Sequence, residues 1–94
     1  MAKSTATVST SRGAGIIIVS WSSGEGSSKA RKYFREALTS FDCVDVDKAQ
    51  TGPRLYINVS LKKLNKLSAH DREQTWVGLR EQVGKAVDSF FPGI

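Results

Sequence analysis

Hydrophobic and polar residues alternate most regularly in residues 54–62. One side of this segment carries Leu55, Ile57, Val59 and Leu61, and the other carries Tyr56, Asn58, Ser60 and Lys62. Because successive side chains of a strand point to opposite faces, the alternation predicts a half-buried β-strand. Residues 42–47 alternate in the same way and are acidic, which predicts an edge strand. Residues 15–21 are apolar and β-branched through Val19, a pattern typical of a strand covered on both faces.

Two other segments have the 3.6-residue period of amphipathic helices. In the first, apolar residues form one stripe from Ala30 to Phe41, and Ser27 or Ser28 can cap the N-terminus. The second helix is predicted after Ser68, which is followed three residues later by an acid, as in a capping box. Its apolar stripe consists of Trp76, Leu79, Val83, Val87 and Phe90, and it is predicted to end before Pro92-Gly93.

The order strand, helix, strand, strand, helix predicts an α+β fold, a three-stranded mixed sheet with both helices on one face. A right-handed crossover makes the first two strands parallel, and a hairpin places residues 54–62 in the centre, antiparallel to both neighbours. The strand at 15–21 is too apolar for an open edge, so either the N-terminal segment or a second chain should complete the sheet. A homodimer is the assembly that this pattern favours.

Residues 1–13 are rich in Ser, Thr and Ala, with Val8 as the only large apolar residue after Met1. Such a segment buries too little apolar surface to offset its ordering entropy, which predicts a flexible tail. Residues 5–10 are nevertheless compatible with a strand at a sheet edge. The chain of 94 residues is 39% hydrophobic, which suits a single domain, predicted at residues 14–94.

The net charge of +5 predicts affinity for nucleic acid, for another polyanion or for an acidic protein face. The longest apolar run is too short to span a membrane and no signal-peptide pattern is present, so we expect a cytoplasmic protein without a membrane partner. The only cysteine is Cys43 and the only histidine is His70, which exclude an intrachain disulfide and make a metal site improbable. No catalytic set assembles from these residues, so we predict a non-enzymatic protein without a cofactor.

Basic residues gather in two clusters. The first contains Lys29, Arg31, Lys32 and Arg35 at the start of the first predicted helix. Cations are unfavourable at a helix N-terminus unless an anion binds there, so this cluster indicates an anionic partner. The second cluster contains Lys62, Lys63 and Lys66, in the connector before the second helix.

A glycine- and serine-containing loop precedes the first basic cluster. Gly24, Gly26, Ser27 and Ser28 lie between a predicted strand and a predicted helix, where phosphate-binding loops occur. The loop lacks the spacing of the known nucleotide motifs and contains Glu25, which would repel phosphate. It is therefore only a candidate anion-binding loop.

These features favour a small basic protein that binds RNA or DNA phosphates through both clusters. Tyr56, on the open face of the sheet with Trp21 near it, is a candidate for stacking on bases. Two alternatives apply to these residues. One is ordinary solvent exposure of the sheet face and of the basic helix face, and the other is an acidic protein partner. The second hypothesis is a protein-interaction module, an adaptor or inhibitor that acts through a sheet edge or a dimer interface.

Overall fold

The sheet is centred on the segment with the clearest alternation. The computed structural model describes residues 6–21, 27–49 and 53–91. Strand β4 (Arg54–Val59) lies between β2 (Ile16–Trp21) and β3 (Val44–Lys48) and is antiparallel to both, which confirms its predicted central position. Strands β2 and β3 run in the same direction but do not touch, so the sheet is antiparallel rather than mixed.

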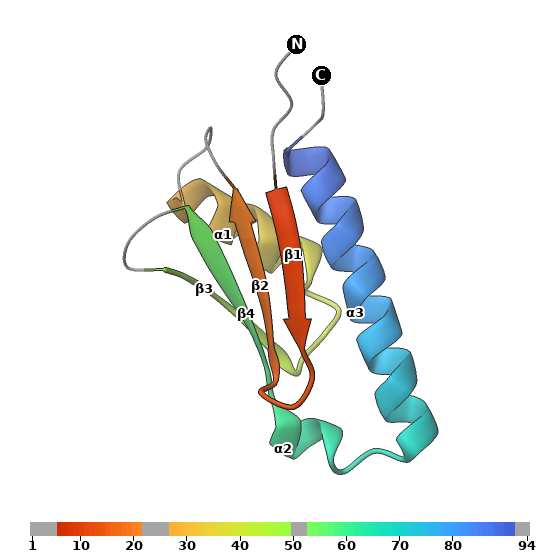
Figure 1. The fold of residues 1–94 in the computed structure, drawn as a ribbon. Coiled ribbons are helices and arrows are strands. Elements are labelled where there is room, and N and C mark those ends of the chain that lie inside the picture. The colour runs from red at the N-terminus through yellow and green to blue at the C-terminus, as the bar shows by residue number, and fades with distance from the viewer. Residues whose placement is uncertain (1–5, 22–26, 50–52, 92–94) are drawn as a thin grey trace.

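A fourth strand, β1 (Ala6–Ser11), completes the sheet in the order β1-β2-β4-β3 (Figure 1). It pairs with β2 from Ala6 opposite Trp21 to Ser11 opposite Ile16. The prediction of three strands is therefore wrong, and the alternative in which the N-terminal segment completes the sheet is correct. Residues 6–11 lie within the segment for which a flexible tail is predicted, but they form β1. The open edge of β2 that favoured a homodimer is covered within the same chain.

Helices α1 (Ser27–Ala37) and α3 (Ala69–Phe90) cover one face of the sheet, and the other face is open. The alternation in β4 explains this arrangement, because Leu55, Ile57 and Val59 are buried while Arg54 and Asn58 are exposed. No charged side chain is buried among the described residues. The most completely buried side chains are Phe34, Ile17, Leu55, Ile57, Leu64, Leu79, Val19, Val46 and Val83.

Serine caps decide where two of the helices begin. Ser68 Oγ accepts a hydrogen bond of 3.1 Å from the backbone N–H of Asp71, which confirms the predicted N-cap of α3. Ser60 Oγ accepts a bond of 3.3 Å from the N–H of Lys63 and so caps a one-turn helix, α2 (Leu61–Leu64). The predicted strand over 54–62 therefore ends at Val59, and Leu61 and Lys62 are helical.

The β1–β2 turn is anchored on α3 through Arg12. Its guanidinium forms an ion pair with Glu73 and lies 5.7 Å above the ring centre of Trp76. The hydrogen bond from Arg12 lowers the pKa of the Glu73 carboxyl. This contact spans 61 residues of sequence and holds a polar strand against the domain.

None of the helices in the described residues is long and apolar enough to cross a membrane.

The end of β2 packs on the C-terminal turn of α3. Trp21 is 4% exposed, and its ring centre lies 5.0 Å from that of Phe91. Phe91 in turn contacts Phe90, at 4.8 Å between ring centres. Trp21 therefore belongs to the helix-covered face, and its expected position near Tyr56 on the open face is wrong.

Candidate nucleic-acid interface

One side of α1 follows the edge strand β3. Lys48 Nζ donates a hydrogen bond of 2.9 Å to Ser28 Oγ, and Arg31 Nε donates one of 3.1 Å to the carbonyl oxygen of Val46. Arg35 lines a hollow of about 250 Å³ together with Val44 and other residues of this edge. Helix positions 28, 31 and 35 share one side, as do strand positions 48, 46 and 44. The basic helix is therefore aligned with the edge of the sheet.

Lys48 joins the first basic cluster, which was predicted without it. The available signal was its position two residues after Val46, on the side of β3 that faces α1. Lys29, Lys32 and Arg35 are exposed, and Arg31 is half-buried because it covers the β3 edge. The nearby acids are Glu36, Asp45 and Asp47, of which Asp47 accepts a hydrogen bond from Asn58.

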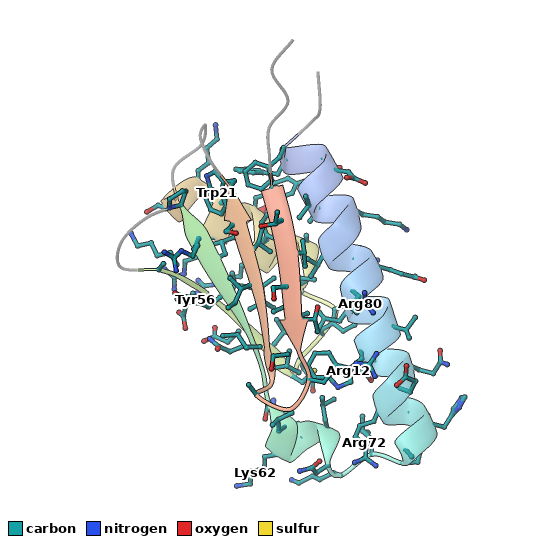
Figure 2. All side chains as sticks on the ribbon, viewed as in Figure 1. Arg12, Trp21, Tyr56, Lys62, Arg72 and Arg80 are labelled. Carbon is teal, nitrogen blue, oxygen red and sulfur yellow. The ribbon has the colours of Figure 1, made fainter. Side chains whose placement is uncertain are left out.

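Two members of the second cluster, Lys63 and Lys66, line a larger hollow of about 490 Å³ between α2, α3 and the turn after α1. Lys62, Lys63 and Lys66 are all exposed, and Lys63 Nζ donates a hydrogen bond of 3.0 Å to the carbonyl oxygen of Asp42. Figure 2 shows Lys62 at the foot of the molecule, beneath β4. The hollow is lined by Ser40, Phe41, Asp42, Cys43, Lys63, Leu64, Lys66, Leu67 and Thr75.

Phe41 lines both hollows and so connects the two clusters. It is half-buried in the turn that leads from α1 to β3, with Arg35 in the lining on one side and Lys63 and Lys66 on the other. We define the basic track as the eight cations of the two clusters, Lys48 included. They are Lys29, Arg31, Lys32, Arg35, Lys48, Lys62, Lys63 and Lys66.

Tyr56 lies away from the basic track, on the open face of the sheet. It is half-buried opposite Ile18 on β2 and opposite Asp47 on β3 (Figure 2). The structure therefore places an aliphatic side chain and a carboxylate beside the one tyrosine of this face, and does not bring the lysines to it.

The candidate anion-binding loop is described only at its end. Gly24 and Gly26 lie outside the described residues, so this prediction stays a prediction. Helix α1 begins at Ser27, and Ser28 binds Lys48 as described above. His70 is exposed in the first turn of α3.

Cys43 is buried in the wall of the larger hollow. Burial raises the pKa of its thiol, and the charge of Asp42 acts in the same direction, while Cys43's own backbone hydrogen bond and the charge of Lys63 oppose the shift. Because the thiolate is the reactive form, we expect slow labelling of the native protein at neutral pH, with the rate rising only above the ordinary thiol range. The labelling rate with a disulfide reagent, followed against pH in native and urea-unfolded protein, checks this. Equal pH profiles in the two states would contradict it.

Comparison with known proteins adds no relative: no protein-family model, curated protein or solved structure matches the chain.

Proposed function

We propose that this chain is a small non-enzymatic nucleic-acid-binding protein that contacts the phosphates of RNA or DNA along the basic track. The observation that supports the proposal is the continuity through Phe41, which lines both the hollow of Arg35 and the hollow of Lys63 and Lys66, cations 28 or more residues apart in sequence. Phosphates repeat along a nucleic-acid strand, so a row of cations suits them better than one isolated cluster does.

We assign the phosphate contacts to the exposed cations of the basic track other than Lys63. Lys29, Lys32, Arg35, Lys62 and Lys66 are all exposed, as is the Lys48 side chain beside Ser28. Arg31 and Lys63 donate hydrogen bonds to backbone carbonyls, so we assign them mainly to holding the β3 edge and the turn after α1 in place. Contacts to the phosphates of a nucleic acid carry little information about its base sequence. We therefore expect the protein to show weak preference among nucleic-acid sequences.

Salt dependence tests the proposal directly. Binding of single- and double-stranded RNA and DNA is measured by fluorescence anisotropy over a series of salt concentrations. If about five phosphates are contacted, the logarithm of the association constant should fall against the logarithm of salt with a slope of about −3.5 to −4.5. Absence of binding at low salt, or a slope near zero, would contradict the proposal.

The alternative function is a protein-interaction module, an adaptor or inhibitor. It is favoured by one observation, that β1 is an uncharged strand at an edge of the sheet. An acidic protein would instead compete for the basic track, and displacement of a labelled oligonucleotide by a polyglutamate peptide separates the two kinds of anionic partner.

A further inference from the structure

The outer edge of β1 presents unpaired backbone groups in a defined pattern. The N–H of Val59 donates to the carbonyl of Gly15 at 2.8 Å, and the N–H of Trp21 donates to that of Pro53 at 3.1 Å. In an antiparallel ladder the bonding direction alternates, so the odd-numbered residues of β2 bond to β4 and the even-numbered residues bond to β1. Residues 7, 9 and 11 are the β1 partners of those even residues. The backbone groups of Ala6, Val8 and Thr10 therefore point away from the sheet.

The other edge of the sheet is protected. Arg31 covers the outward carbonyl of Val46, and the N–H of Val44 donates to the carbonyl of Phe41 at 3.3 Å. Strand β3 also carries the charges of Asp45, Asp47 and Lys48. Covering side chains and charges are the usual means by which proteins prevent pairing at an edge. Pairing with a further strand is therefore disfavoured at β3.

The edge at β1 has none of these protections in the described residues. The strand ATVSTS carries no charge and no proline, and Val8 is 44% exposed although it lies on the helix-covered face. The charge of Arg12, next in sequence, is compensated by Glu73. Two copies of a chain of net charge +5 repel each other overall, but residues 6–11, which would meet in a contact between two β1 strands, carry no charge.

We propose that β1 pairs antiparallel with β1 of a second copy, with the two-fold axis at Val8. In this register Val8 pairs with Val8 of the partner subunit, and Ala6 and Thr10 pair with each other across the axis. It is the one symmetric register that uses all the outward backbone groups of residues 6, 8 and 10, and the edge is therefore complementary to itself. The dimer has one continuous eight-stranded sheet.

The contact is a single pair of short strands, which is smaller than most stable interfaces. The dimer is therefore concentration-dependent. Sedimentation equilibrium or light scattering from micromolar to millimolar protein should show a monomer–dimer equilibrium. A chain that remains monomeric throughout this range would overturn the inference.

Substitutions at Val8 test the register. Proline at this position (V8P) removes the outward N–H but none of the bonds to β2, since those come from residues 7, 9 and 11. The two central hydrogen bonds of the dimer are lost, and we expect dimerisation about 30-fold weaker. V8K places two ammonium groups at the axis and should weaken the dimer at least as much. V77K alters a valine of similar exposure, 38%, on α3 and is the matched control.

Cysteine crosslinking gives a second readout. In a Cys43→Ala background, V8C should form an intersubunit disulfide on oxidation, because Cα atoms of a paired position are about 5.5 Å apart. T10C should not crosslink with itself, since its two copies are about 13 Å apart in this register. Dimers that persist in V8P and V8K, or that crosslink through T10C rather than V8C, would overturn the inference. Retained circular dichroism spectra in each variant separate loss of pairing from loss of fold.

Discussion

Reversing two charges of the basic track, in the variant K32E/R35E, is expected to weaken nucleic-acid binding about 100-fold at low salt. Both side chains are exposed on α1, and Arg35 lies on the side that borders the hollow at β3. Each substitution removes a charge-assisted hydrogen bond to phosphate and places a carboxylate in the same position. The salt dependence should become shallower as well, by about 0.7 to 0.9 in slope for each lost contact. Arg31 is left in place because it covers the β3 edge.

A control variant tests whether nucleic-acid binding depends on where the cations lie or only on the net charge. R80E/K85E reverses two exposed cations on α3, outside the basic track, and changes the net charge from +5 to +1, as K32E/R35E does. If the basic track carries binding, this control should lose little affinity beyond the general electrostatic effect. Equal losses in the two variants would mean that only net charge matters, and would remove the basic track from the proposal. Thermal unfolding of both variants shows whether either has lost its fold.

The sheet centre and the helices could be predicted because their signals are local. The alternation of Leu55, Ile57 and Val59 is visible along five residues, and burial of that side is what drives the helices onto it. The cap at Ser68 is likewise contained in four residues. The cap is stabilised by neighbours in sequence. The apolar face of the strand is stabilised by burial against any apolar surface, so its position can be predicted without knowing which element covers it.

Strand β1 could not be predicted in the same way. Its residues are Ser, Thr, Ala and Val, which have no strong apolar alternation, and most of its side chains remain exposed. Its order comes from backbone pairing with β2, from the 2.8 Å hydrogen bond between Thr7 and Ser20, and from the docking of Arg12 on α3. These contacts are tertiary, so the sequence supports a strand only as an alternative to a tail.

The candidate site also combines features that are local in the sequence with features that depend on tertiary contacts. The cations of the basic track are evident as clusters in the sequence, except for Lys48, which is a single lysine at the end of the acidic strand β3. Its partnership with Ser28 depends on the register between α1 and β3, and the link between the clusters depends on where Phe41 packs. Neither relation is encoded in spacing along the chain. Tyr56 is the converse case, because its strand position was correct but its cross-strand neighbours are Ile18 and Asp47 rather than cations of the basic track.

The largest effect of a single methyl group is expected at Gly15, where G15A should reduce the free energy of unfolding by about 2–4 kcal/mol. Gly15 has a φ of +66°, which disfavours every other residue, and an added Cβ would lie 2.7 Å from the carbonyl oxygen of Val59 and 2.9 Å from Leu61 Cγ. The backbone cannot easily withdraw, because the carbonyl of Gly15 accepts the 2.8 Å hydrogen bond from Val59. In a domain of this size the melting temperature should fall by roughly 10–20 °C.

Two glycines of α3 serve as controls with the opposite sign. A Cβ at Gly84 would meet no atom within 4 Å, and one at Gly78 would meet Phe41 at 3.7 Å, an ordinary contact. Both positions are helical, so G84A and G78A should each raise the free energy of unfolding by about 0.5–1 kcal/mol. Chemical denaturation of the three variants measures these differences. If G15A unfolds like the parent chain, the turn from β1 into β2 does not pack against β4 at Val59, and the placement of β1 at the edge of the sheet loses its main geometric support.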